Sequence, residues 1–222
     1  MQEVEYRKHF NIVANDITAA TSSFYTYMEI NKFASDDQEN YNKINRDAYF
    51  WMGQLYALQT TWFIVLGRLF DRGGYSIRKF LALTVAHKGL FSKNMLAERK
   101  RKAAGQDNPE WLGEYMRTAW EPTTQDLQDI AGSISTAEAK WKQSYKPIRD
   151  KVFAHHDLGV SVNQLFGNTL VGDIEDILHD LNRLRIAIFQ LLENSRHQWI
   201  ADDDRTYINP FVADTRSFLG HL

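Results

Sequence analysis

The segment KPIRDKVFAHHD, Lys146–Asp157, combines an arginine, two adjacent histidines and two aspartates within twelve residues. Histidine titrates close to neutral pH, so it can accept or donate a proton. Arginine carries a fixed positive charge on a planar fork that matches the oxygens of a phosphate group. Arg149 with His155 or His156 is therefore a candidate set for proton transfer beside a negatively charged group.

The same segment also fits a purely structural interpretation. On a straight helix its apolar side chains share one side with both histidines, in two neighbouring stripes: Ile148, Val152 and His155, and Arg149, Phe153 and His156. The opposite side would carry Asp150, Lys151 and Ala154. An amphipathic helix of this kind needs no chemistry, because histidines in a last turn are favoured by the helix dipole.

The spacing of the arginine and the histidines does not decide between these interpretations. With 14 arginines and seven histidines in the chain, an arginine followed by a histidine after four to six intervening residues is expected about once by chance. Arg216 and His221 also fit this spacing, in a tail for which little order is expected. The context of the motif must therefore carry the argument.

Four long amphipathic segments are predicted to position the motif. Each repeats apolar residues every three or four positions, which is typical of one buried face of an α-helix. The stripes are Tyr6, Phe10, Val13, Ile17, Ala20, Phe24 and Tyr27; Tyr41, Ile44, Ala48, Trp51, Leu55, Leu58, Trp62, Val65 and Leu69; Leu127, Ile130, Ile134, Ala137 and Trp141; and Ile174, Ile177, Leu181, Leu184, Ile188 and Leu191. Strand patterns are almost absent. The sequence predicts an all-α protein, an antiparallel helical bundle with additional short helices.

Local signals predict where several helices begin and end. Ser76 and Ser92 are suitable N-caps for two short helices. The third long helix should falter at Lys146, because the residue before a proline disfavours the α conformation. Pro147 can then occupy the first position of a new helix. Residues 157–168 are predicted to form a loop.

Composition limits the class of protein. The chain has 222 residues, 44% hydrophobic and 13% aromatic, with a formal charge of −2 and no cysteine. The near-balanced charge predicts that any nucleic-acid contact is local. The lack of cysteine excludes a disulfide framework and a thiolate zinc site, and indicates a reducing compartment, the cytoplasm. The charged start and the short apolar runs predict neither a signal peptide nor a membrane span.

Two other clusters are weaker candidates. Asp176, His179 and Asp180 share a helix face, but a bundle metal site needs matching ligands from other helices, and the conceivable ones, Glu29 and Asp47, do not repeat the pattern. No metal site is therefore predicted, and both aspartates are expected to be solvated. The segment ERKRK, residues 98–102, could contact an RNA backbone or form a solvated helix end.

In its bundle context, the string IRDKVFAHHD resembles the motif of the AbiU-like, abortive-infection branch of the HEPN superfamily. The superfamily motif is an arginine, usually followed by a polar residue, with a histidine after four to six intervening residues. The AbiU-like branch typically has aspartate or asparagine after the arginine, then an alanine-histidine pair and an aspartate two positions on. Arg149, Asp150, Ala154, His155 and Asp157 match this pattern. The segment LGRLFD, residues 66–71, is also similar to that branch. The resemblance covers residues 1–195 as a HEPN-like bundle domain, with 196–222 as a C-terminal tail packing on the bundle or extending from it.

The resemblance implies a metal-independent endoribonuclease of a phage-defence or toxin-antitoxin system, with no cofactor. Arg149 and His155 would be catalytic, His156 is the competing histidine, and Asp150 would orient one of them. One histidine cannot easily be both base and acid, so a homodimer with the motif at its axis is expected. RNA is the expected substrate and an antitoxin protein a further partner. The alternative is a non-catalytic HEPN-like module that binds a protein, nucleotide or RNA.

One departure concerns regulation. Some HEPN toxins carry a tyrosine two positions after the motif histidine, where a partner nucleotidyltransferase modifies them. That position is Asp157 here. The resemblance therefore does not imply this route of control.

Overall fold

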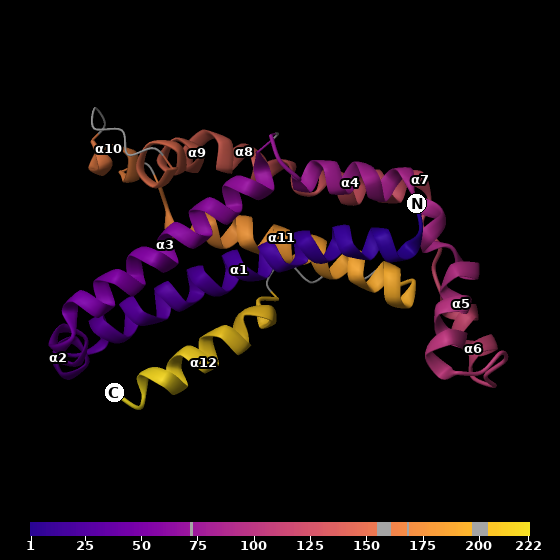
Figure 1. Ribbon diagram of the computed structural model, residues 1–222, viewed down its shortest axis with the longest axis horizontal. Helices are drawn as coiled ribbons and strands as arrows, with labels where there is room; N and C mark the ends of the chain where they lie inside the picture. The colour runs from indigo at the N-terminus through magenta and orange to yellow at the C-terminus, as the bar shows by residue number, and fades with distance from the viewer. Residues whose placement is uncertain (72, 155–160, 168, 197–203) are drawn as a thin grey trace.

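The computed structural model describes residues 1–71, 73–154, 161–167, 169–196 and 204–222, and every regular element within these ranges is helical. Figure 1 shows an elongated bundle in which the longest helices run side by side and the shorter ones lie along two opposite sides and at both ends. The all-α bundle predicted from the apolar stripes is confirmed. None of the helices in these ranges is both long and apolar enough to cross a membrane.

Helix α1, Glu3–Asp36, is the central element (Figure 1). Three helices pack against it: α3 (Ala48–Phe70), α11 (Val171–Asn194) and α12 (Asn209–Leu219). The first predicted stripe forms its inner face. Most members of the stripe are buried, whereas Phe10 and Tyr27 are half-buried. The hydroxyl group of Tyr6 lies 2.8 Å from the hydroxyl oxygen of Thr84 on α4 and satisfies a polar group inside the core. A 34-residue helix thus carries the surface on which the other helices pack.

The second stripe is divided between α2, Gln38–Arg46, and α3, Ala48–Phe70. The expectation of one continuous helix is wrong, because Asp47 leaves the helical conformation with φ −119° and ψ 45°. Its N–H bonds back to the carbonyl of Ile44, which closes α2 with a tight turn. The C-terminal half of α3 is buried as predicted, but Tyr41 is exposed and Leu55 and Leu58 are only half-buried.

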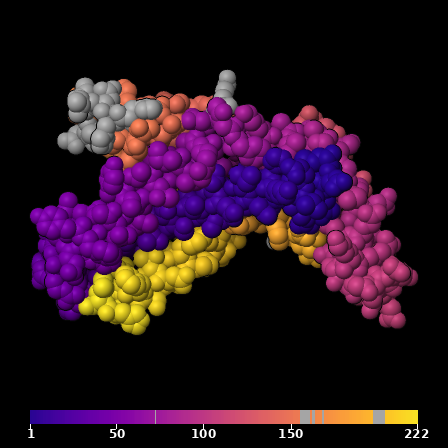
Figure 2. Space-filling model, viewed as in Figure 1, coloured from indigo at the N-terminus to yellow at the C-terminus, as the bar shows by residue number. Residues whose placement is uncertain are grey.

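The predicted caps start the two short helices that follow. Ser76 accepts a hydrogen bond from the Lys79 N–H at the start of α4, Ile77–Ala86. After a 3₁₀ turn at Lys88–Phe91, Ser92 accepts one from Met95 and starts α5, Lys93–Ala104. Gly105 ends α5 with φ 63°, a left-handed conformation that suits glycine. With α6, Leu112–Thr118, α5 projects from one end of the molecule (Figure 2).

The motif lies at the end of a series of short helical segments, and not on a new helix after one long helix as expected. Every member of the third stripe is buried, but the stripe is divided: Leu127 and Ile130 lie on α7, Thr124–Gly132, and Ala137 on α8, Ser135–Lys140. Ile134 lies between these two helices, and Trp141 follows α8. The chain then continues through a π-helical segment at Trp141–Tyr145, α9 at Lys146–Ile148, and a second π-helical segment at Arg149–Ala154.

The predicted break at Lys146 is wrong, since this residue keeps α-helical angles, φ −57° and ψ −43°. Pro147 has no N–H to donate within a helix. The turn before it widens instead: the Lys146 N–H bonds to the carbonyl of Trp141, five residues back, as in a π-helix. The helix therefore passes through the proline rather than restarting after it.

The remaining helices complete the bundle. Residues 157–168 were expected to form a loop, but α10 occupies Val162–Phe166 within them. Helix α11, Val171–Asn194, buries every member of the fourth predicted stripe. After a 3₁₀ turn at Thr206–Ile208, α12, Asn209–Leu219, packs along α1. The expectation of little order in the tail is therefore wrong for Asn209–Leu219.

The buried apolar residues form two clusters. The larger one joins α1, α3, α4, α7, α8, α9 and α11 and includes Trp141 and Ile148, both fully buried. The smaller one, Ile30, Ile44, Trp51 and Leu219, lies where α2 and α12 meet α1 and α3. The motif segment therefore belongs to the main core, through residues directly before Arg149.

Candidate active site around Arg149

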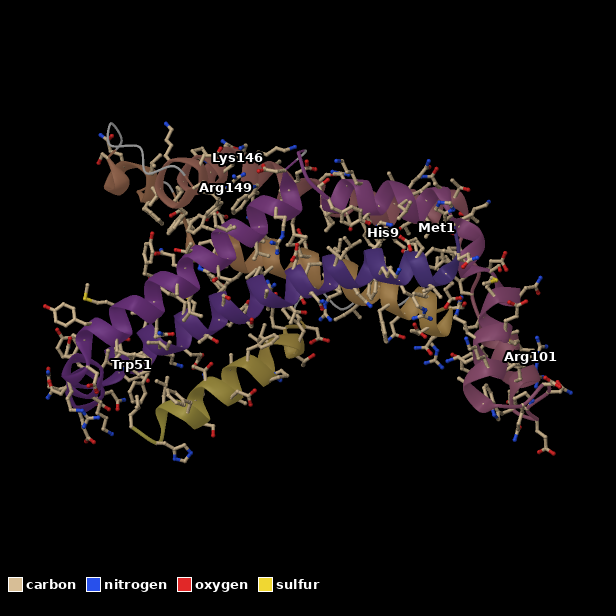
Figure 3. The ribbon with its side chains drawn as sticks, viewed as in Figure 1. Met1, His9, Trp51, Arg101, Lys146 and Arg149 are labelled. Atoms are coloured by element: carbon tan, nitrogen blue, oxygen red, sulfur yellow. The ribbon has the colours of Figure 1, made fainter. Side chains whose placement is uncertain are left out.

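Arg149 lies at the start of the second π-helical segment, against the last turns of α3 (Figure 3). Only 15% of its side chain is exposed. Its two terminal nitrogens face different carboxylates: Nη2 donates a hydrogen bond to Asp71 Oδ2, and Nη1 lies 3.0 Å from Asp150 Oδ1. Its guanidinium is therefore held from two sides.

Lys146 completes an alternating arrangement of charges. Its Nζ lies 2.6 Å from Asp150 Oδ2 and 3.7 Å from Asp71 Oδ1. We call Asp71, Lys146, Arg149 and Asp150 the Arg149 cluster. Two cations and two carboxylates give it no net charge, and each carboxylate contacts both cations. The cluster joins the end of α3 to α9.

The segment LGRLFD at the end of α3 supplies the far side of this cluster. Leu66, Leu69 and Phe70 are buried in the main core. Arg68 is anchored to α1, with its Nε 2.8 Å from Asp16 Oδ2. Gly67 faces Arg149: a β-carbon placed on Gly67 would lie 2.7 Å from Arg149 Nε. Arg68 therefore ties the end of α3 to α1, whereas Gly67 and Asp71 face Arg149.

A hollow of about 740 Å³ opens beside the Arg149 cluster. This volume is within the range of small-molecule sites in proteins, roughly 300–1,000 Å³. The hollow lies between the end of α3 and the segment from Trp141 to Ile148, and its walls are Arg68, Phe70, Asp71, Gly73, Gly74, Lys142 and Lys146. Three of these residues are cations and one is an acid. Each cation also pairs with a carboxylate: Arg68 with Asp16, Lys142 with Glu138, and Lys146 with Asp150. An anionic ligand in the hollow would therefore share these cations with the protein's own acids.

His155, His156 and Asp157 lie outside the described residues, and Ala154 is the last described residue before them. The segment that leads to them corrects one sequence argument. The stripes that grouped His155 with Ile148, and His156 with Arg149, assumed a straight α-helix. Since Arg149–Ala154 is π-helical, successive side chains turn by a smaller angle than on a straight α-helix. The assignment of His155 and His156 to the two stripes lies outside the described residues and stays a prediction. Ile148 is nevertheless fully buried and Val152 and Phe153 half-buried, as an amphipathic helix requires.

Among the predicted residues, Arg149 and Asp150 are brought together. Sequence reasoning gave no role to Gly67, Asp71 or Lys146. Asp71 and Arg149 are 78 positions apart, so no local pattern links them. The ion pair between Lys146 and Asp150 could have been predicted from the sequence, because oppositely charged side chains four residues apart meet on one helix face.

The second candidate, on α11, forms a separate polar cluster. Asp176 is exposed as predicted, and it pairs with Lys140 at 3.1 Å and Arg205 at 3.5 Å. His179 is buried, with its ring stacked on Tyr207 at 5.8 Å between centroids. Asp180 is half-buried, not solvated as expected. Within the described part of the chain no group of three or more His, Cys, Asp or Glu residues could hold a metal ion.

Burial raises the pKa of the Asp180 carboxyl group, and the nearby Arg183 only partly opposes this. A carboxyl group with a raised pKa in the folded state stabilises the fold when protonated, and this contribution is lost as the pH rises through the folded-state pKa. Asp180→Asn is therefore expected to raise the free energy of unfolding at neutral pH and to lose this advantage at acidic pH.

Urea denaturation at both pH values measures this difference. Asp129→Asn, at an exposed position of α7, is the control and should change little at either pH. An Asp180→Asn variant less stable than the wild type at neutral pH would contradict the expectation.

The basic segment 98–102 is partly committed to packing. Arg99 donates to Glu3 at 3.1 Å and to the carbonyl of Leu90 at 3.0 Å, so it ties α5 to α1. Lys100 contacts Asn194 and lies over the ring of Tyr115. In Figure 3, Arg101 is at the opposite end of the molecule from Arg149. This segment is therefore not a wall of the hollow.

The fold defines the class of protein first: it is an all-α bundle with an arginine-centred charge cluster at the end of α3. A family model described as AbiU2 (HEPN_AbiU2) matches residues 3–209. The chain therefore belongs to the HEPN AbiU2 family. No curated protein and no solved structure gave a significant match.

Proposed function

We propose that this protein is a metal-independent endoribonuclease of a phage-defence or toxin-antitoxin system. The proposal is carried by the position of Arg149, fixed beside a hollow lined by Arg68, Lys142 and Lys146, in a chain that belongs to the HEPN AbiU2 family. In it, Arg149 and His155 act directly on the RNA, Asp150 orients Arg149, and RNA lies in the hollow.

The reaction needs two proton transfers and one stabilised charge. The 2′-oxygen of the RNA forms a bond to the neighbouring phosphorus while a histidine accepts its proton. The bond from phosphorus to the 5′-oxygen then breaks, and a second histidine gives that oxygen a proton. Arg149 neutralises the charge that grows on the non-bridging oxygens. The products are a 2′,3′-cyclic phosphate and a 5′-hydroxyl.

A second copy of the chain would supply the second histidine. The N-terminal half of α3 supports this, because one face of it presents large side chains to solvent: Tyr49, Met52 and Tyr56 are all more than half exposed. Tyr56 also contacts Phe153 of the motif segment, with ring centroids 6.3 Å apart. Exposed apolar side chains along one helix face are typical of protein interfaces. The proposed dimer buries this face and brings two motifs together.

The direct test is incubation of the purified protein with mixed RNA in the presence of EDTA. The proposal predicts cleavage, with fragments that end in 2′,3′-cyclic phosphate and begin with 5′-hydroxyl. Cleavage that stops in EDTA would contradict a metal-independent reaction. Chromatography with light scattering tests the dimer, and a strict monomer would remove the two-copy site.

The two histidines can be separated by single variants. His155→Ala is expected to lower the cleavage rate by about 100- to 10,000-fold, the usual effect of losing a general acid or base. His156→Ala, its direct neighbour and matched control, should stay within a few-fold of the wild type. Initial rates at one RNA concentration suffice. The opposite ranking would assign the role to His156.

One observation favours a second function. Both terminal nitrogens of Arg149 already face carboxylates, so the cluster is also consistent with a purely structural role. The chain would then be a non-catalytic module that binds a protein, nucleotide or RNA partner. A folded dimer that cleaves no RNA in the EDTA assay would favour this alternative.

A further inference from the structure

We infer that Gly67 and Asp71, at the end of α3, are positioning residues that form a seat for the motif arginine. This inference rests on the proposed function for its effect on cleavage, although the seat itself can be observed without any activity. The seat has two parts: a missing side chain that makes room for the guanidinium, and a carboxylate that orients it.

Gly67 provides the space. It is buried within α3, and the three nearest atoms to a β-carbon placed there all belong to Arg149: Nε at 2.7 Å, Cζ at 3.1 Å and Cδ at 3.3 Å. The first distance is shorter than real β-carbon contacts, so even alanine would move the arginine. These three atoms belong to the outer part of a flexible side chain, and none of them is a backbone atom. Alanine at this position should therefore shift Arg149 and leave the fold intact.

Asp71 provides the orientation. It is the first residue after α3, and its extended backbone, φ −79° and ψ 148°, directs the chain away from the helix axis. Its Oδ2 accepts a hydrogen bond from Arg149 Nη2, and its other oxygen faces Lys146 at 3.7 Å. Asp71 also lines the hollow. Asp71 thus connects Arg149 to the wall of the hollow in which RNA is proposed to lie.

The end of α3 is itself held firmly, so it can act as a fixed support. Leu66 and Leu69 are buried in the main core, and Arg68 is bonded to Asp16 on α1 through two nitrogens. The last turn of the helix is closed by the Asp71 N–H, which bonds to the Gly67 carbonyl at 2.8 Å. The two seat residues therefore belong to a helix end that the main core and α1 hold in place.

The test compares Gly67→Ala and Asp71→Asn with a matched control, Gly53→Ala. Gly53 lies on the same helix, and a β-carbon placed there meets nothing within 4 Å. Asp71→Asn keeps the shape of the side chain and removes its charge. With two independent seat variants, misfolding of one does not prevent the test.

The first readout needs no RNA. NMR of protein labelled with ¹⁵N-arginine reports the Nε–H signal of Arg149 and the rotation of its guanidinium, and Arg149→Lys assigns the signal. We expect a distinct, slowly rotating guanidinium in the wild type and in Gly53→Ala, and faster rotation with a moved signal in Gly67→Ala and Asp71→Asn. An unchanged Arg149 signal in both seat variants, or a loss of the signal in Gly53→Ala, overturns the inference.

The second readout is the kinetics of RNA cleavage. A misplaced catalytic group can cost on the order of 100-fold in rate, so kcat should fall to that extent in both seat variants while KM changes little. A change confined to KM overturns the positioning role. If the Arg149 signal moves in the seat variants but the wild type cleaves no RNA, the seat is supported and the proposed function is contradicted. The two failures are therefore distinguishable.

Discussion

Replacing Arg149 by alanine is expected to lower the rate of RNA cleavage by about 100- to 1,000-fold, the usual cost of removing one donor that stabilises charge in a transition state. The variant loses both the fixed charge and the planar fork. Arg149→Lys keeps the charge but not the fork, so it should recover only part of the rate. Initial rates in EDTA, at saturating and at low RNA concentration, measure both effects.

Arg216→Ala is the control, because Arg216 and His221 have the same kind of spacing as the motif. Arg216 lies on α12 and pairs with Glu29 on α1, at 2.7 Å from Nε to Oε2. Its removal should leave cleavage within a few-fold of the wild type. Equal losses in Arg149→Ala and Arg216→Ala would contradict the assignment, as would cleavage by Arg149→Ala at the wild-type rate.

Replacing Trp141 by alanine is expected to cost about 3–5 kcal/mol of the free energy of unfolding, as for other large aromatic residues in protein cores. Trp141 is fully buried at the first π-helical segment, and its ring lies near those of Phe63, Phe70 and Tyr145, at 6.0–6.2 Å between centroids. The cavity left by the indole ring would separate the motif segment from α3. Urea denaturation followed by circular dichroism measures the loss.

Trp111→Ala is the matched control, since Trp111 is about half exposed just before α6. We expect it to cost less than about 1 kcal/mol, in line with other surface substitutions. If the two tryptophan variants unfold at the same urea concentration, Trp141 does not hold the motif segment to the core.

Periodicity predicted much of the fold because burial follows it closely. The stripes of α1 and α11 were sufficient to place both helices, since a helix of 34 or 24 residues with one apolar face has few other stable arrangements. The interruptions were harder to predict. The break at Asp47 follows a short polar helix whose end is set by a single tight turn, and the apolar stripe continues across it.

Pro147 shows why a local rule can fail. The residue before a proline disfavours the α conformation, yet Lys146 adopts it. Packing explains the difference: Trp141, Tyr145 and Ile148 are all buried in the main core, and a break between them would expose apolar surface. The π-helical turn keeps these residues inside while it accommodates the proline. Tertiary packing thus outweighed a local preference, and no single-residue rule contains that information.

The candidate site was predictable where its residues are neighbours in the chain. Arg149 and Asp150 are adjacent, and the chain pairs them at 3.0 Å. The contribution of α3 was not predictable, because Gly67 and Asp71 reach Arg149 only after the bundle has folded. A glycine near a helix end has many explanations. At Gly67 the structure shows which explanation applies, because a β-carbon on this residue would lie 2.7 Å from Arg149 Nε.

The central claim is a catalytic site to which two copies of the chain contribute, and a hybrid dimer tests it most directly. One copy is wild type and the other carries both Arg149→Ala and His155→Ala, with different affinity tags so that only mixed dimers are purified. If each reaction needs both motifs, the hybrid should retain less than about a tenth of the cleavage rate of the wild-type dimer. A hybrid with about half of that rate would contradict the claim, because each copy would then act alone.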